Sequence, residues 1–175
     1  LPTGEQIIRF KPLEPYETPG AIASLCDAFN RAMDQCTIDP LLLIPIFIND
    51  FLCIHPFSDG NGRMSRLLTT LLLYRSGYVV GRYISLEQKI EQTKHAYYEA
   101  LAKSGQGWHE ATHDPKAFIT YLLNILCAAY VDFETRISLV ETKGVALDLV
   151  RKAVLDRMGR FTKHDLELAI PTLRK

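Results

Sequence analysis

Between two largely apolar segments, 41–54 and 67–73, the chain concentrates its polar chemistry in the stretch HPFSDGNGRMSR, which runs from His55 to Arg66. An imidazole has a pKa near neutrality, so His55 can take a proton from a hydroxyl nucleophile. Asp59 offers a carboxylate, and Arg63 and Arg66 are three residues apart, which places them on one face of a helix. Together these residue types indicate the chemistry of phosphate esters.

The sequence from Gly60 to Gly62 predicts a turn that leads directly into a helix. Glycine and asparagine tolerate backbone angles that other residues avoid. A helix begins with unpaired N–H groups and a partial positive charge, and glycines at that point let a phosphate approach the backbone. Two arginines so early in a helix are unfavourable by themselves, so we expect an external anion such as a polyphosphate to complete the site.

Asp59 would repel phosphates unless a cation lay between them. Mg²⁺ binds through one or two carboxylates together with phosphate oxygens and waters, so a single aspartate suffices. A zinc site is not indicated, because His55 and Asp59 have no third ligand nearby in the sequence. A Walker loop is not indicated either, since the stretch lacks a Gly-Lys-Ser/Thr element. Phe57, between two polar positions, is expected to turn inward and pin the loop to the core.

The elements that must position this stretch are predicted to be helices. Thr18 before Pro19 predicts one helix start, and Asp39 before Pro40 begins a buried apolar helix over 41–54. Further helices are expected over 62–76, 85–103, from 115 through 133, over 145–158, and briefly between 162 and 171. Only residues 5–10 show strand-like alternation. The predicted class is all-α, with about six to seven helices and at most a short hairpin.

The composition argues against several classes of protein. The chain has 175 residues, is 47% hydrophobic and carries a formal net charge of zero, so it is not a polybasic nucleic-acid or membrane-surface protein. No uninterrupted apolar run reaches the ~18 residues of a membrane span, and no signal-peptide pattern is present. The four cysteines form no Cys-x-x-Cys pair and are expected to be reduced thiols. We therefore expect a cytoplasmic protein without membrane contact.

The order His–x–Phe–x–Asp–Gly–Asn–Gly–Arg–x–x–Arg resembles the signature of the Fic family (filamentation induced by cyclic AMP), and the resemblance extends over about residues 5–142. It implies a helical Fic core over 1–142, and transfer of AMP from ATP to a tyrosine, threonine or serine hydroxyl of a target protein. The roles that it implies are a general base for His55, Mg²⁺ binding for Asp59, an anion hole for Gly60, Asn61 and Gly62, and triphosphate binding for Arg63 and Arg66.

Within this resemblance, Arg66 is expected to point toward the γ-phosphate, and Phe57 is expected to be a core anchor. Tyr97 and Tyr98 resemble a pair of aromatic residues that lines the nucleotide base pocket in the family. The segment near 5–12 resembles the family's flap, a hairpin that holds the target by strand addition. The residues expected to dock the target there are Ile7, Ile8, Arg9 and Phe10.

Many Fic proteins carry an inhibitory helix with the pattern [Ser/Thr]-x-x-x-Glu-[Gly/Asn], which does not occur in these 175 residues. Inhibition would then come from a segment or partner outside this sequence. Residues 143–175 hold eight Lys/Arg against four Asp/Glu, and the part from 159 onward resembles the opening of a winged-helix module. An accessory helical tail and a truncated winged helix are the two interpretations, and only the second would involve nucleic acid.

The predicted function is that of a bacterial-type protein adenylyltransferase that uses ATP and Mg²⁺. A Fic-type phosphotransferase, another nucleotidyl transfer, or removal of AMP from a modified protein would use the same motif. A nucleotide-sensing regulator without turnover is the alternative outside the enzymes, although a pure binder has no need for His55 as a base. The target protein and the modified residue are open, and so is formation of a homodimer.

Overall fold

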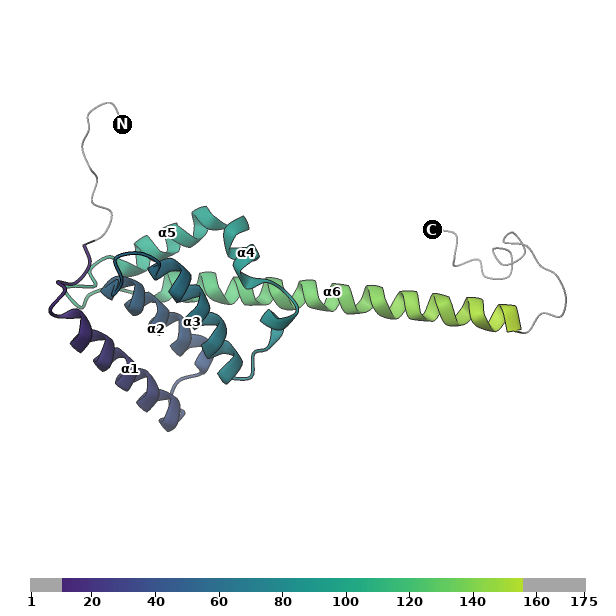
Figure 1. Ribbon diagram of the computed structural model, residues 1–175, viewed down its shortest axis with the longest axis horizontal. Helices are drawn as coiled ribbons and strands as arrows, with labels where there is room; N and C mark the ends of the chain where they lie inside the picture. Colours follow the sequence, from purple (N-terminus) through teal and green to yellow (C-terminus); the bar gives the residue numbers. More distant parts are fainter. Residues whose placement is uncertain (1–10, 156–175) are drawn as a thin grey trace, which may run out of the picture. The chain divides into compact units, whose positions relative to one another are not determined.

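The computed structural model describes residues 11–155, and the described part of the chain is helical throughout, without a strand (Figure 1). This confirms the predicted all-α class. Two compact units follow each other along the chain; the first ends at Tyr130 and the second begins at Val131. The elements are α1 (Thr18–Gln35), α2 (Pro40–Ile54), α3 (Asn61–Arg75), the 3₁₀ turn η1 (Val80–Arg82), α4 (Leu86–Gln92), α5 (Lys94–Gly105) and α6 (Lys116–Leu155).

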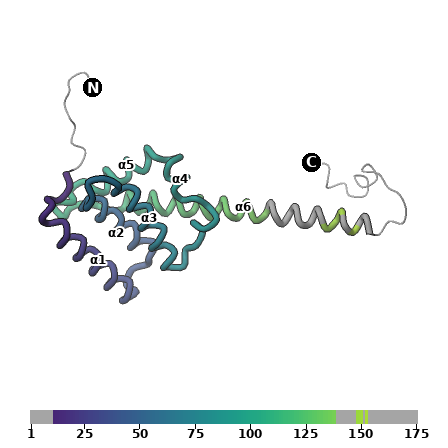
Figure 2. The backbone as a smooth tube through the Cα atoms, viewed as in Figure 1, coloured from purple at the N-terminus to yellow at the C-terminus, as the bar shows by residue number. Residues whose placement is uncertain are grey.

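Helix α2 is the centre of the first unit and packs against α1, α3 and α5 (Figure 2). It is apolar on nearly every side, and both Ile44 and Ile48 are almost completely buried. Phe47 packs on Phe29 of α1, with 4.7 Å between ring centroids. The predicted cap is confirmed, because the carboxylate of Asp39 accepts a hydrogen bond from the N–H of Leu41 at 2.8 Å. A helix buried on most sides holds its carboxyl end, where the polar motif begins, in a fixed position.

The start of α1 differs in detail from the prediction. The helix does begin at Thr18 with Pro19 in its first turn, but the residue before it, Glu17, occupies the cap position. The Thr18 hydroxyl donates to the carbonyl of Glu14 at 3.2 Å, so it does not accept from the first turn as a capping side chain would.

The single helix predicted over 85–103 is wrong, because the structure breaks it at Thr93 into α4 and α5. The cap at Ser85 is confirmed, since its hydroxyl accepts from the N–H of Gln88 at 3.1 Å. At the break, the Thr93 hydroxyl donates to the carbonyl of Lys89 at 2.9 Å and lies 2.7 Å from the Tyr121 hydroxyl. A threonine bonded back to the preceding turn favours a bend, and here a partner from α6 fixes it.

The separate helix predicted over 145–158 is also wrong. Helix α6 runs without interruption from Lys116 to Leu155, through Gly144. One glycine inside a long helix costs only about 1 kcal/mol relative to alanine, which is too little to end it. The flap residues 7–10 and the short helix expected between 162 and 171 lie outside the described residues, so both stay predictions, as does the domain boundary at 142.

The amino-terminal half of α6 completes the core of the first unit. Its buried residues recur at helical spacing, as expected from the sequence, except that Phe133 is only half-buried; they are Phe118, Leu122, Ile125, Leu126 and Ala129. The segment Lys116–Ser138 is long and apolar enough to cross a membrane by length and composition alone, a property that core helices of globular proteins share. Of the most apolar window in this segment, 28% is buried inside the structure.

Candidate functional site

His55 ends α2 and begins the loop that carries the motif. It has φ 55° and ψ 58°, in the left-handed region that non-glycine residues seldom adopt, and its N–H bonds to the carbonyl of Phe51. Its ring nitrogen Nδ1 lies 3.3 Å from the carbonyl oxygen of Leu52. A carbonyl can only accept, so in the neutral ring Nδ1 holds the hydrogen and Nε2 holds the lone pair. Nε2 is therefore the nitrogen that can act as a base.

The loop between α2 and α3 is fastened by Asn61 rather than by Phe57. The Asn61 side chain accepts from the N–H of Phe57 at 3.0 Å and donates to the carbonyl of the same residue. Asn61 is 3% exposed, whereas Phe57 is 45% exposed, and its ring centroid lies 6.3 Å from that of Phe51. The expectation that Phe57 turns inward as the core anchor is wrong. A loop of this sharpness is secured here by two backbone hydrogen bonds, which an apolar ring cannot make.

Gly60 precedes α3 and gives the turn its shape. It has φ 88° and ψ 4°, where a side chain would be strained, and it provides no capping group. The first turn of α3 leaves the N–H groups of Asn61, Gly62 and Arg63 without acceptors inside the helix. These amides and the helix dipole make the amino end of α3 attractive to an anion.

Arg63 folds back over this amino end. Its Nη2 lies 3.0 Å from Asp59 Oδ2, and both side chains are well exposed. A Cβ added at Gly60 would lie 3.5 Å from the same Nη2. The guanidinium group is thus already beside the helix start, and its exposed pairing with Asp59 is weak enough for a phosphate to replace.

The Arg66 side chain folds back over Gly62, as the Arg63 side chain folds back over Gly60. Its Nη1 would lie 3.5 Å from a Cβ added at Gly62, and its Nε donates to Glu87 Oε1 of α4 at 3.2 Å. The side chain of Arg66 is 27% exposed, against 72% for Glu87. Sequence reasoning missed Glu87, because it is 21 residues from Arg66 and no local spacing connects the two.

The two tyrosines of α5 have different surroundings. Tyr97 is 6% exposed, its ring packs edge-on against Phe118 and Tyr121, and its hydroxyl lies near Ser65, inside the motif. Burial raises the pKa of Tyr97, and the nearby Ser65 hydroxyl opposes that shift. Tyr98 is 57% exposed. Tyr97 therefore supports the start of α3 from inside; contact of either ring with a nucleotide base stays a prediction.

A second polar cluster lies one turn before His55 on α2. Asp50 accepts a hydrogen bond from the Trp108 indole at 2.9 Å, and its Oδ1 lies 3.5 Å from His113 Nε2. Burial raises the pKa of Asp50, and its contacts with Trp108 and then His113 oppose that rise. Burial, followed by the charge of Asp50, also raises the pKa of the Cys53 thiol to about 12. These contacts tie the segment between α5 and α6 to the helix that carries His55.

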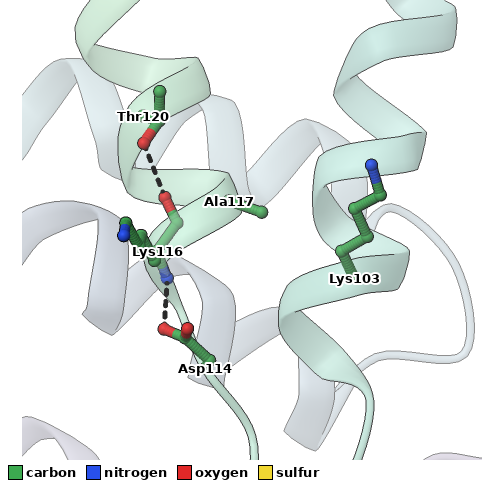
Figure 3. A pocket seen from close by; sticks show the side chains of 5 residues that line it. All are labelled: Lys103, Asp114, Lys116, Ala117 and Thr120. Carbon is green, nitrogen blue, oxygen red and sulfur yellow. Dashed lines mark hydrogen bonds between the residues drawn. The ribbon is translucent and has the colours of Figure 1, made fainter.

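The open pocket shown in Figure 3, of about 430 Å³, lies apart from the motif. Lys103 of α5 faces it from one side, and the start of α6 faces it from the other. Asp114 caps α6 there by accepting from the N–H of Lys116 at 3.0 Å. None of the five lining residues belongs to the stretch 55–66.

The loop that carries the motif offers one carboxylate that fits Mg²⁺ when phosphate oxygens and waters complete the shell of the ion. Within residues 11–155, no group of three or more His, Cys, Asp or Glu side chains could hold a metal by itself. Asp59 is the acidic residue of the loop, and it is exposed enough to meet phosphate oxygens and waters, the ligands with which Mg²⁺ completes its shell. Asp59 is therefore the residue of this chain that would hold the ion.

Three comparisons with known proteins agree on one family. The sequence model of the Fic/DOC family matches residues 3–73, a range that includes the whole motif. Protein adenylyltransferase fic-1 of Caenorhabditis elegans is 37% identical over 70 residues, which are 40% of this chain and 14% of the relative. A probable protein adenylyltransferase of Aquifex aeolicus is 33% identical over 93 residues, which are 53% of this chain and 28% of the relative.

Two crystal structures resemble the fold. A Fic domain-containing signalling protein of Bacteroides thetaiotaomicron has a TM-score of 0.57 at 28% identity, over 69% of this chain and 47% of that protein. A Fic family protein of Desulfovibrio desulfuricans has the same TM-score and identity, over 98% of this chain and 49% of that protein. The chain thus spans less than half of either structure and less than a third of the two curated relatives.

Proposed function

We propose that this chain, which the family match and the Fic-domain structures identify as a Fic family protein, transfers AMP from ATP to a hydroxyl group of a target protein. The relatives named as protein adenylyltransferases support this class of reaction. The motif residues that carry the proposal share one loop and one helix end, in the order that the family signature requires.

The observation that carries the proposal is the position of the two guanidinium groups. Arg63 lies over Gly60 and Arg66 over Gly62, so both positive charges stand beside the amides at the amino end of α3. Like charges repel each other and the helix dipole, and only exposed carboxylates offset them here. A triphosphate would neutralise both arginines at once and accept from the amides, as a transferring phosphoryl group requires.

His55 would act as the base at the edge of this site. The hydrogen bond from Nδ1 to Leu52 fixes the ring and leaves the lone pair on Nε2. The target hydroxyl oxygen would form a bond with the α-phosphorus while its proton passes to Nε2. The bond between the α-phosphorus and the bridging oxygen would break, and pyrophosphate would leave. Donors placed toward the phosphates would stabilise the charge that develops on them.

Mg²⁺ would be held by Asp59 together with the phosphates, and when bound it would neutralise part of their negative charge. Asp59 would have to exchange its contact with Arg63 for the ion. That exchange would free the Arg63 guanidinium for a phosphate, since the exposed pair contributes little stability.

The finer expectations stay predictions. They concern a flap at residues 7–10 that docks the target, Tyr97 and Tyr98 at the adenine base, an inhibitory segment or partner outside this sequence, a winged-helix tail that would contact nucleic acid, a homodimer, and a cytoplasmic location. The identity of the target is open in the same way.

The proposal is tested with two batches of ATP, labelled at the α- or the γ-phosphate. Each is incubated with Mg²⁺, a cell lysate and the purified protein, beside the variants His55→Ala and His95→Ala. His95 is an exposed histidine of α5 outside the motif, so it is the matched control. We expect protein-bound α-label with the wild type and with His95→Ala, and none with His55→Ala.

Other results would assign another function. Label that enters protein only from the γ-position would indicate a phosphotransferase. The absence of label from both positions, with ATP still bound, would indicate a nucleotide sensor. α-Label that persists in His55→Ala would remove His55 from its role as the base.

A further inference from the structure

Glu87 lies in the first turn of α4 and reaches a residue of the motif from outside it. Its Oε1 accepts a hydrogen bond from Arg66 Nε at 3.2 Å. Its side chain is 72% exposed, whereas that of Arg66 is 27% exposed. The pair therefore joins a half-enclosed guanidinium group to an accessible carboxylate on another helix.

Glu87 contacts one edge of the Arg66 guanidinium group, and the other edge lies beside the start of α3. Glu87 engages Nε, while Nη1 stands 3.5 Å from the position of a Cβ at Gly62, beside the start of α3. A guanidinium group is planar and has five N–H donors, so a carboxylate on one edge and a phosphate on the other are compatible. Without the carboxylate, the flexible Arg66 side chain would lose rotamer freedom each time an anion bound.

Lys94, a charged neighbour of Arg66, does not offer this support. Lys94 of α5 interacts with Arg66 as a like charge, and its own partner is Glu91 at 3.0 Å. Within the described chain, Glu87 is the carboxylate that forms an ion pair with Arg66.

We propose that Glu87 is a positioning residue: it holds the Arg66 guanidinium over Gly62, ready for the terminal phosphate of a nucleoside triphosphate. The inference rests on the proposed function for the identity of the ligand. It assigns Glu87 to support of binding rather than to competition with the nucleotide for Arg66.

The two roles predict opposite changes in ATP affinity when the Glu87 carboxylate is removed. If Glu87 positions Arg66, its removal weakens binding of a nucleotide that has a γ-phosphate and leaves a shorter nucleotide unaffected. If Glu87 competes, its removal strengthens triphosphate binding, because one negative charge leaves the site. Exposed ion pairs are weak, so we expect an effect of about three- to fivefold.

The test is equilibrium binding of ATP and of ADP, each with Mg²⁺, to the purified protein. The variants are Glu87→Ala, Glu87→Gln and Glu91→Ala, and thermal unfolding verifies that each is folded. Glu91 lies on the same helix and is also an exposed glutamate in an ion pair, so Glu91→Ala controls for the loss of one negative charge. Glu87→Gln keeps an oxygen that can accept from Nε.

We expect Glu87→Ala to weaken ATP binding about three- to fivefold and to leave ADP binding within about twofold of the wild type. Glu87→Gln should recover part of the loss, and Glu91→Ala should bind both nucleotides as the wild type does. Tighter ATP binding, an equal loss for ATP and ADP, or the same loss in Glu91→Ala would overturn the inference.

Failure of the proposed function gives a different pattern. If the wild type binds ATP and responds to Glu87→Ala as expected but transfers no AMP, the inference holds and the transferase proposal fails. If the wild type transfers AMP but Glu87→Ala binds ATP normally, only the inference fails. If the wild type binds neither nucleotide, both are overturned.

Discussion

The Asn61 side chain bonds to both backbone groups of Phe57: it accepts from the Phe57 N–H at 3.0 Å and donates to the Phe57 carbonyl. This pair closes the turn between α2 and α3 from within, because Asn61 is 3% exposed. Asn61, to which the family resemblance assigns a place in the anion hole, thus has a side chain and a backbone N–H with different roles. Its side chain fixes the loop, and its backbone N–H belongs to the first turn of α3.

Replacing Asn61 by alanine should therefore lower both stability and nucleotide binding. Two partly buried backbone groups of Phe57 would lose their partners, at a cost of about 1 kcal/mol each. Urea unfolding would measure the stability, and equilibrium binding of ATP would measure the effect on the site. The control is Asn49→Ala in α2, which removes a buried amide bonded to Ser104. Asn49→Ala should lower stability with little effect on ATP, and equal effects on ATP in both variants would contradict this assignment.

The motif glycines should respond differently to alanine. Gly60→Ala places a side chain at φ 88°, which costs about 1–2 kcal/mol and should lower the melting temperature by roughly 2–8 °C. Gly62→Ala meets only ordinary contact with Arg66, so the fold should tolerate it. Its methyl group would stand where a phosphate must approach the amides, and ATP binding should weaken on the order of tenfold.

Gly20→Ala in α1 is the matched control for Gly62→Ala, since a Cβ there meets nothing within 4 Å. Both substitutions should keep or slightly raise stability, because alanine favours a helix by about 1 kcal/mol over glycine. Normal ATP affinity in Gly62→Ala would show that no anion approaches this part of the helix.

The partly buried carboxyl of Asp50 should make stability depend on pH. Its folded pKa is raised, by burial first, so the folded protein holds this proton more tightly than the unfolded chain does. The associated stability is complete below the ordinary pKa of 3.8 and is lost as the pH rises through the folded value. Urea unfolding of the wild type and Asp50→Asn between pH 4 and pH 7 measures it. The asparagine keeps an acceptor for Trp108 but does not titrate.

We expect the stability of the wild type relative to Asp50→Asn to fall as the pH rises across this interval. A difference that stays constant with pH would mean that the pKa of Asp50 is the same in both states. A difference that rises with pH would mean that Trp108 and His113 outweigh burial, the reverse of the assigned order.

Three of the four cysteines, Cys36, Cys53 and Cys127, should fall into two classes of reactivity. Cys36 and Cys127 are exposed, whereas Cys53 is buried with its Sγ 3.4 Å from the position of a Cβ at Gly105. The thiolate is the reactive form, and a pKa of about 12 leaves Cys53 about one part in 10⁴ ionised at pH 8. A thiol reagent at pH 8 should modify Cys36 and Cys127 in the folded protein, and Cys53 only after denaturation.

Mass spectrometry of the labelled peptides would identify the sites. The double variant with serine at positions 36 and 127 should lose the fast reaction and retain the slow one. Rapid modification of Cys53 in the folded protein would show that α2 opens near the motif on the time scale of the reaction.

Much of the local structure could be predicted because short-range rules determine it. The caps at Asp39 and Ser85 form because each side-chain oxygen accepts a hydrogen bond from a backbone N–H two or three residues later. The burial of α2 follows from its apolar composition. The break at Thr93 could not be predicted, since the hydroxyl that supports it comes from Tyr121, 28 residues later. A periodic pattern over 85–103 is compatible with one helix or two, and the packing of α6 decides between them.

For the candidate site, the sequence by itself determined the residue types and their order from His55 to Arg66, and with them the turn and helix start that favour a phosphate. Only the tertiary structure decided the pairing of Arg66 with Glu87, the burial of Tyr97 against Ser65, and the exposure of Phe57. Local spacing fixes which residues share a turn of helix. It does not fix which helices meet, because those contacts depend on how α3, α4 and α5 pack around the buried α2.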